Sequence, residues 1–172
     1  MMYEKNMRSA RLLMRPVALA DKEAWTKFFV NEEGNEFIPD FGLSNPSEKA
    51  SLWITKQMER YEKKQFGLLA MIEKNSEHLV GMCGLLTQEV DHKTELEIGY
   101  HILKRYRGMG YATEAARYFK KYAFDRDLAP SLVSIIHIGN KYSVNVALRI
   151  NMSFEKQTRW RDKDVFLFRV KK

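Results

Sequence analysis

The spacing of apolar residues along the chain changes several times between a helical and an extended repeat. Apolar residues three or four positions apart, such as Trp25, Phe28 and Phe29, predict amphipathic helices. Short alternating or continuous apolar runs predict strands. Strands are expected at residues 12–17, 66–73, 78–89, 94–103, 132–138, 154–159 and 164–170, and helices at residues 21–32, 46–64, 108–126 and 140–150. This order, β-α-α-β-β-β-α-β-α-β-β, predicts an α/β (α+β) sandwich with one mixed central sheet.

Local signals refine several of these boundaries. Asn45 is expected to cap the second helix and Asn140 the last one, and Asn151 suits the left-handed residue that ends a helix. Pro16 predicts that the first strand lies at a sheet edge. The links at residues 74–77 and 90–93 are short, so the three middle strands should form an antiparallel meander. The loop at residues 33–45 carries apolar side chains, which predicts that it packs under the core or lines a site.

Length and composition limit the class of protein. With 172 residues the chain is expected to form a single domain spanning residues 1–172, in which residues 1–8 are a possible flexible N-terminus. The longest apolar run, Leu68–Ile72, is too short to span a membrane, and the polar N-terminus predicts no secretory signal. A single cysteine, Cys83, excludes an internal disulfide and fits a reducing cytoplasm. The four histidines are not at metal-ligand spacing, so no metal is expected.

The chain is basic, with 29 Lys and Arg against 22 Asp and Glu, a formal net charge of +7. This surplus suggests an anionic partner such as a phosphorylated cofactor or nucleic acid, although a basic surface without such a role is an equal alternative. Nucleic acid is disfavoured, because the sequence has no ordered basic stripe with interleaved aromatic residues.

The most informative segment is a basic loop between a predicted strand and a predicted helix. Gly108 and Gly110 allow a ligand to approach the backbone closely, and the following helix start offers unpaired N–H groups. Together these features predict an anion site suited to a pyrophosphate, although a tight turn would need the same glycines. Arg105 and Arg107 would add charge-assisted hydrogen bonds. The P-loop motif is absent, and the preceding meander does not fit a Rossmann site.

This segment resembles the acetyl-CoA signature of the GNAT acetyltransferase superfamily, [Q/R]-x-x-G-x-[G/A], with Arg107, Gly110 and Ala112 in the key places. Residues 11–16 and the segment 140–152 resemble the branch that acetylates the N-termini of ribosomal proteins. The resemblance therefore covers nearly the whole chain and implies a GNAT-like sheet whose splayed strands hold acetyl-CoA. It implies that acetyl-CoA contacts Ile102, Arg107, Gly108, Met109, Gly110, Tyr111, Ala112 and Asn140.

Acetyl transfer to an amine requires a base, since an ammonium cannot attack a thioester. Glu97 is the candidate, because a carboxylate on an otherwise apolar strand needs a partner or a task; a structural or amine-binding role is an equal alternative. Glu95 is held in reserve. The resemblance implies that Ser143 interacts with the departing thiolate, because the tyrosine that many relatives place seven residues after the asparagine is Ala147 here; a role for Ser143 only in capping or packing the first turn of the helix is the alternative.

The acceptor is the least defined part of this prediction. The branch resemblance implies a protein N-terminus, and small-molecule amines are the alternative; the basic charge disfavours a polyamine. The candidate pocket residues are Phe37, Phe41, Trp53, His137 and Trp160. An acetyl-CoA-binding module with little activity is the alternative to an enzyme. The oligomeric state is expected to be a monomer or a homodimer.

Overall fold

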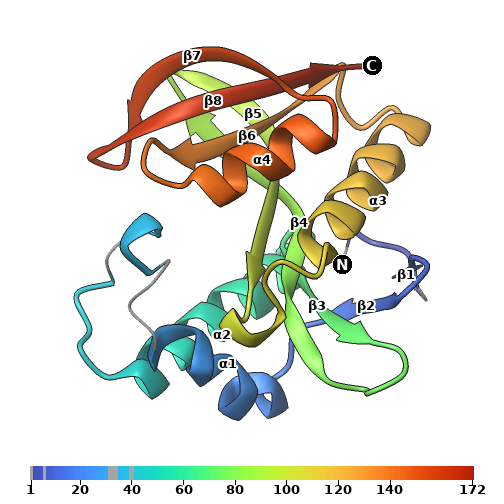
Figure 1. Ribbon diagram of the computed structural model, residues 1–172, viewed down its shortest axis with the longest axis vertical. Coiled ribbons are helices and arrows are strands. Elements are labelled where there is room, and N and C mark those ends of the chain that lie inside the picture. Colours follow the sequence, from blue (N-terminus) through green and yellow to red (C-terminus); the bar gives the residue numbers. More distant parts are fainter. Residues whose placement is uncertain (1, 6, 31–34, 39–40) are drawn as a thin grey trace.

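The computed structural model describes residues 2–5, 7–30, 35–38 and 41–172 and contains one eight-stranded mixed sheet (Figure 1). Its strand order is β1-β2-β3-β4-β5-β6-β8-β7, and all neighbours are antiparallel except β5 and β6. The strands are β1 (Met7–Arg8), β2 (Leu12–Pro16), β3 (Leu68–Glu73), β4 (Leu79–Val90), β5 (Lys93–Ile102), β6 (Ser131–His137), β7 (Ser153–Trp160) and β8 (Lys163–Lys171). The predicted fold class and the antiparallel meander of β3, β4 and β5 are confirmed.

Four α-helices formed by the described residues cover the two faces of this sheet: α1 (Lys22–Val30), α2 (Pro46–Glu62), α3 (Tyr111–Asp125) and α4 (Lys141–Arg149). The ring of His101 on β5 lies 4.8 Å from that of Trp53 on α2. The neighbouring residue, Tyr100, donates a hydrogen bond to the carbonyl of Ser143 on α4. Successive residues of a strand point to opposite faces, so α1 and α2 cover one face, the α1–α2 face, and α4 covers the other, the α3–α4 face.

The N-terminal region differs from the prediction in two respects. A two-residue strand, β1, pairs with Leu13 and Met14, so β2 is not the outermost strand. Pro16 is tolerated because it lies beyond the stretch that β1 covers. Within the predicted flexible segment 1–8, Tyr3 is buried and its hydroxyl accepts a hydrogen bond from the backbone N–H of Leu85.

The helix boundaries follow local capping chemistry. The Asn45 side chain accepts hydrogen bonds from the backbone N–H groups of Ser47 and Glu48, and Asn151 has a positive φ of 64°, as predicted. The helix expected from residue 108 begins only at Tyr111, because Gly108 and Gly110 both adopt left-handed backbone conformations. Helix α1 follows a short 3₁₀ turn (Leu19–Asp21), and the predicted end of this helix at residues 31–32 lies outside the described residues.

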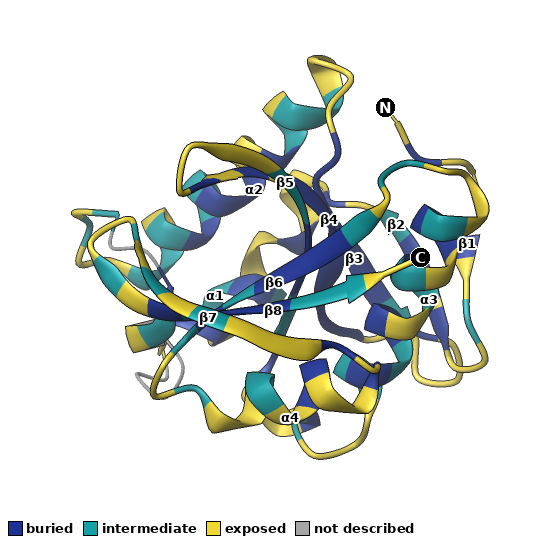
Figure 2. Ribbon diagram, turned by 90° about the horizontal axis from the view of Figure 1, so that it is seen from above, coloured by how far each residue is buried: buried dark blue, intermediate teal, exposed yellow. Residues whose placement is uncertain are grey.

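The burial pattern follows the order of the strands in the sheet (Figure 2). β6 is largely buried and β8 is partly buried, whereas β7, at the outer edge, is mainly exposed. On the α1–α2 face, Trp25, Phe28 and Trp53 pack against one another with ring centroids 4.6 to 6.3 Å apart. Each fully buried side chain of this size contributes roughly 1.5–3 kcal/mol to folding.

The central feature of the sheet is the way in which β5 leaves β6. β4 and β5 pair along their lengths, from Gly81↔Ile102 to Val90↔Lys93, whereas β5 and β6 share a single register pair, Glu97↔Val133. Figure 1 shows β5 running from the group formed by β6, β7 and β8 toward α1 and α2. Residues 98–102 of β5 therefore continue without β6 as a neighbouring strand.

Candidate active site

The loop before α3 presents an uncapped helix start. Gly108 and Gly110 have φ values of 78° and 81°, and Gly110 is the N-cap of α3. Helices α2 and α4 are capped by Asn45 and Asn140, but the N-cap of α3 has no side chain to accept a hydrogen bond. The first N–H groups of this helix thus keep their capacity to bind an anion, and the helix dipole favours negative charge there.

Arg11 connects the N-terminal strand region to this loop through hydrogen bonds. Its Nη1 donates to the carbonyl of Met109 at 3.0 Å, and its Nε donates to Oε2 of Glu114 at 2.6 Å. Its guanidinium also lies 4.4 Å from the centroid of the Tyr111 ring. Arg11 thus contacts the loop and the first turn of α3 at once, a role that the sequence did not reveal.

The carboxyl end of β5 offers backbone groups on the side that β6 has left. The N–H of Leu103 donates to the carbonyl of Val80, toward β4, so the backbone of Ile102 faces the opposite side. Arg107 Nε donates to the carbonyl of Ile102 at 3.3 Å, and this hydrogen bond connects the glycine loop to the end of β5. The segment from the end of β5 to the start of α3 therefore contains most of the predicted cofactor residues: Ile102, Arg107, Gly108, Met109, Gly110, Tyr111 and Ala112.

Glu97 lies at the point where the two strands part. Its Oε2 accepts a hydrogen bond from Nε2 of Gln88 at 2.8 Å, and its Oε1 accepts one from the N–H of Ile135 on β6 at 3.4 Å. The side chain is only 8% exposed, and this burial raises the pKa of the carboxyl although both hydrogen bonds oppose the rise. A general base works best when its pKa lies near the working pH. A carboxyl with a raised pKa therefore accepts a proton near neutral pH more readily than a carboxyl with the usual pKa of glutamate.

Two other titratable groups of β5 are less suited to proton transfer. Glu95, the reserve candidate, forms a double hydrogen bond with Arg169 at 2.8 and 2.9 Å, which holds its pKa below the usual value. His101 contacts Trp53 and Phe28, and burial lowers its pKa to about 4. Its imidazole is therefore neutral at pH 7.

Ser143 lies in the first turn of α4, on the α3–α4 face. Its N–H donates to Oδ1 of Asn140 at 3.1 Å, and its carbonyl accepts the hydroxyl of Tyr100 at 2.9 Å. Tyr100 thus connects β5 to α4 beyond the point where the strands part. Ala147 is fully buried and has no group that could donate a proton, and the side chain of Tyr142 is exposed.

The five aromatic and histidine candidates for an acceptor pocket fall into three places on the molecule. Phe41 and Trp53 pack together at 5.9 Å within the aromatic core. Phe37 lies 5.2 Å from His137, whose Nδ1 accepts the N–H of Gly139. Trp160 lines a cavity near the hairpin of β7 and β8, which does not include the other four candidates.

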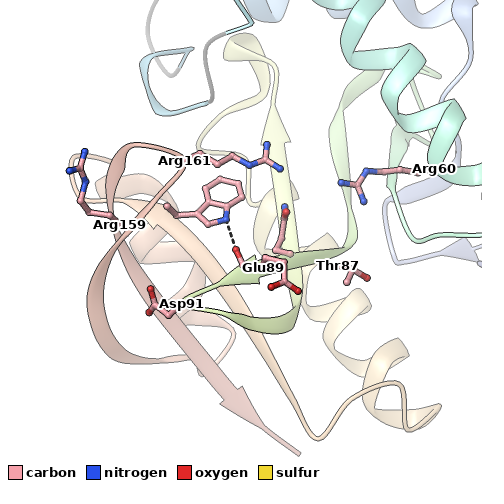
Figure 3. A pocket seen from close by; sticks show the side chains of 8 residues that line it. Arg60, Thr87, Glu89, Asp91, Arg159 and Arg161 are labelled. Carbon is pink, nitrogen blue, oxygen red and sulfur yellow. Dashed lines mark hydrogen bonds between the residues drawn. The ribbon is translucent and has the colours of Figure 1, made fainter.

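This cavity has a volume of about 510 Å³ (Figure 3). Its lining residues come from α2, β4, the turn after β4 and the β7–β8 hairpin: Arg60, Thr87, Gln88, Glu89, Asp91, Arg159, Trp160 and Arg161. Trp160 is held by a hydrogen bond from its Nε1 to the carbonyl of Glu89 at 3.0 Å. Gln88 belongs to the lining and also bonds Glu97, so the cavity adjoins the buried carboxyl.

Sequence reasoning missed Arg11, Arg60, Gln88, Tyr100 and Arg161 as members of the site. Arg11 lies within a segment that resembles the family and Tyr100 follows the candidate base closely, but no chemistry in the sequence assigned either a role. Arg60 and Arg161 are 101 positions apart in the sequence, and only the fold places both at the lining of one cavity.

Neither a metal cluster nor a membrane-spanning helix occurs in the part of the chain that the structure describes. No three His, Cys, Asp or Glu side chains of these residues come together in a way that could hold a metal ion. None of the helices formed by these residues is both long and apolar enough to cross a membrane.

Comparison with known proteins gives a consistent family likeness. Residues 11–153 match the family model described as "Acetyltransferase (GNAT) domain". The uncharacterised protein YkkB of Bacillus subtilis (strain 168) is 34% identical over 99 residues, a match that spans 58% of this chain and 58% of that relative.

Two solved structures share the fold. An acetyltransferase from Agrobacterium tumefaciens str. C58 superposes with a TM-score of 0.78 at 24% identity, covering 99% of this chain and 96% of that one. RimJ from Mycobacterium smegmatis, in complex with CoA-disulfide, superposes with a TM-score of 0.75 at 16% identity, covering 93% and 81%.

Proposed function

The chain belongs to the GNAT acetyltransferase family, and on this premise we propose that it transfers the acetyl group of acetyl-CoA to a primary amine by direct attack in a ternary complex. The observation that carries the proposal is the position of Glu97: a buried carboxyl lies at the one register pair between β5 and β6, where the sheet opens. The proposed site therefore combines a base with an opening between strands.

The residues present suit acetyl-CoA, the acetyl donor of the reaction. The uncapped start of α3 and the glycines before it offer backbone N–H groups to the pyrophosphate. Ile102, with its backbone on the open side of β5, would bind the pantetheine arm near the thioester, and Asn140 would contact the arm from α4. An N–H at the position of Ile102 would also stabilise the oxyanion of the tetrahedral intermediate.

In the chemical step, the amine nitrogen attacks the thioester carbonyl carbon and the carbon–sulfur bond breaks. Glu97 takes up the proton that the amine must lose, directly or through a water molecule. The thiolate leaves with the electron pair of the broken bond and is then protonated. Ser143, in the first turn of α4, is the proposed hydrogen-bond donor to the sulfur, because Ala147 cannot serve.

Two classes of acceptor remain in the proposal: a protein N-terminus and a small-molecule amine. The resemblance of residues 11–16 and 140–152 to the branch that acetylates the N-termini of ribosomal proteins supports the first. The cavity beside Glu97 supports the second, because its volume of about 510 Å³ is of the size that holds a small molecule.

One observation favours a second function, an acetyl-CoA-binding module with little activity. The position at which many relatives have a tyrosine holds the fully buried Ala147. The retained Glu97 and Ser143 weigh against this function.

The test begins with calorimetric titration of acetyl-CoA, in which saturable one-site binding is expected. CoA release is then measured with a panel of amines. Saturable binding without CoA release from any amine would support the binding module, and the absence of binding by folded protein would overturn both functions.

The role of Glu97 is tested by Glu97→Gln. At neutral pH, where most of the amine is protonated, the variant should lose about 10²–10⁴-fold in kcat/KM, and the loss should shrink at high pH where free amine is abundant. A pH profile with the same shape as that of the wild type would leave Glu97 without a role as base.

The same variant has a second, independent readout. The pKa of Glu97 is raised in the folded state, so folding favours its protonated form, and ionisation above the folded pKa costs stability. Glu97→Gln should therefore raise Tm at pH 7 and have little effect at pH 4. Equal shifts at both pH values would contradict the burial of an ionised carboxylate.

A further inference from the structure

The cavity beside Glu97 contains two arginines that face each other. Arg60 comes from the last turn of α2 and Arg161 from the turn between β7 and β8, and Figure 3 shows their guanidinium groups pointing toward one another. Each lines the cavity. Two positive charges that point into the same cavity form a candidate site for an anion.

Within the described part of the chain, no carboxylate forms an ion pair with either arginine. Arg60 Nη1 lies 3.5 Å from the carbonyl of Phe66, and the Arg161 guanidinium lies 4.4 Å from the Trp160 ring centroid. Arg161 lowers the pKa of Arg60, in addition to the larger effect of burial, and the opposing effect of Glu97 is smaller. An anion between the two guanidinium groups would relieve their repulsion.

The carboxylates of the cavity are bonded to other residues. Glu89 accepts the hydroxyl of Thr94 at 2.6 Å. Asp91 pairs with Lys156 at 2.6 Å and also accepts the hydroxyl of Thr158. Arg159, the third arginine of the cavity, points away from it in Figure 3 and lies 4.0 Å from Asp164. Arg60 and Arg161 are thus the two charges directed at the space.

Arg161 lies in the turn between β7 and β8, next to Trp160. With φ values of 48° and 61°, Arg161 and Asp162 form a two-residue turn of the kind that favours Asn and Gly. A long charged side chain is therefore held at a strained turn position, stacked on a tryptophan that is itself fixed to Glu89.

From this geometry we infer that the acceptor is a small primary amine bearing a carboxylate or a phosphate a few bonds from its nitrogen, and that Arg60 and Arg161 bind this anionic group. The inference rests on the proposed acetyl transfer. Gln88 lines the cavity and bonds Glu97, so an acceptor anchored by its anion would extend its amine toward the proposed base. Guanidinium pairs bind both anions with charge-assisted hydrogen bonds.

The test compares matched amines with and without the charge: 4-aminobutyrate with 4-aminobutyramide, and O-phosphoethanolamine with ethanolamine. Values of kcat/KM are calculated from the concentration of unprotonated amine, so that differences between the amines in pKa do not affect the comparison. We expect the wild type to prefer one anionic member by about 10- to 100-fold in kcat/KM. The pair that shows the preference distinguishes carboxylate from phosphate.

Arg60→Gln and Arg161→Gln should each reduce this preference to within about threefold, while the affinity for acetyl-CoA is unchanged. Arg159→Gln is the matched control on the same hairpin and should keep the preference. Equal rates for both members of each pair, or a preference that survives in both variants, would overturn the anion site while leaving acetyl transfer intact. The anion site would also be refuted if peptide N-termini outperform every anionic amine and both variants acetylate them normally.

A binding measurement separates the two proposals. Calorimetry with O-phosphoethanolamine and 4-aminobutyrate, on protein saturated with CoA, should show binding of one of them by the wild type and its loss in Arg161→Gln. Binding without acetylation of any amine would refute the proposed function and retain the anion site. Absence of binding, together with normal acetylation of neutral amines, would refute the site alone.

Discussion

Arg11 and Glu114 are 103 residues apart in the chain, yet they form a double contact beneath the glycine loop. The backbone N–H of Arg11 donates to Oε1 of Glu114 at 2.8 Å, and its Nε donates to Oε2 at 2.6 Å. Ser9 adds a third hydrogen bond to the same carboxylate at 2.7 Å. The start of α3 is thereby fixed to the N-terminal strand region.

Removal of this contact should loosen the loop and weaken acetyl-CoA binding. We expect Arg11→Gln to cost about 1 kcal/mol of stability, since the pair is partly exposed, and to lower acetyl-CoA affinity several-fold. Chemical denaturation and calorimetry measure the two effects. Lys121→Gln, in an exposed pair on the same helix, is the control and should change neither.

The contribution of Glu114 should depend on pH. Burial acts to raise the pKa of Glu114, but the hydrogen bonds from Ser9 and Arg11 outweigh it and the pKa is lowered. The contribution to stability is thus present above the unfolded pKa, about 4.3, and is lost as pH falls below it. The destabilisation by Glu114→Gln should therefore be full at pH 7 and shrink as the pH falls through the lowered pKa of the folded state; a constant difference would contradict this assignment.

Gly110→Ala should weaken acetyl-CoA binding at least tenfold. The new Cβ would sit in a left-handed conformation and 3.4 Å from Nη2 of Arg11, at the start of α3. The backbone strain alone costs about 1–2 kcal/mol. Gly42→Ala carries the same kind of strain at a φ of 65°, with no atom within 4 Å, and should lower stability without affecting the ligand. Normal binding by folded Gly110→Ala would refute the pyrophosphate assignment.

Two asparagines allow capping to be separated from ligand binding. Asn45 and Asn140 cap α2 and α4 through their side chains, so replacing either with Ala should cost about 1 kcal/mol of stability. Only Asn140→Ala should also reduce the affinity for acetyl-CoA in calorimetry. Equal affinities in both variants would restrict Asn140 to its capping role.

Ser143 and Tyr100 are expected to affect different steps. Ser143→Ala should lower kcat about tenfold with acetyl-CoA affinity unchanged, because the proposed hydrogen bond forms to the departing thiolate. Tyr100→Phe removes the bond to the Ser143 carbonyl and should cost about 1 kcal/mol of stability. If Ser143→Ala retains full kcat, another group must assist the thiolate.

The elements and their caps could be predicted because they depend on neighbours in sequence. Asn45, Asn140 and Asn151 act where the local pattern placed them. The start of α3 was predicted three residues early. The sequence alone does not show whether Gly108 and Gly110 belong to the first turn of the helix or, as in the structure, to the left-handed loop before it.

The site was only partly predictable because its geometry depends on contacts between distant segments. Glu97 stood out as a charge on an apolar strand, but its bond to Gln88 depends on the register of β4 and β5. Arg60 and Arg161 look like ordinary surface residues in the sequence, one at a helix end and one in a hairpin turn. Only the fold directs both at one cavity.

The single register pair between β5 and β6 has a thermodynamic consequence. In the proposed complex, the pantetheine arm lies along the part of β5 that pairs with β4 but lacks β6 on its other side, so a substrate extends the sheet. Its binding free energy then adds to the stability of the fold, by about 2.7 kcal/mol at a concentration one hundred times Kd. The resistance of the protein to proteolysis would therefore rise and fall with the supply of acetyl-CoA, because the fraction of unfolded chains changes in the opposite direction.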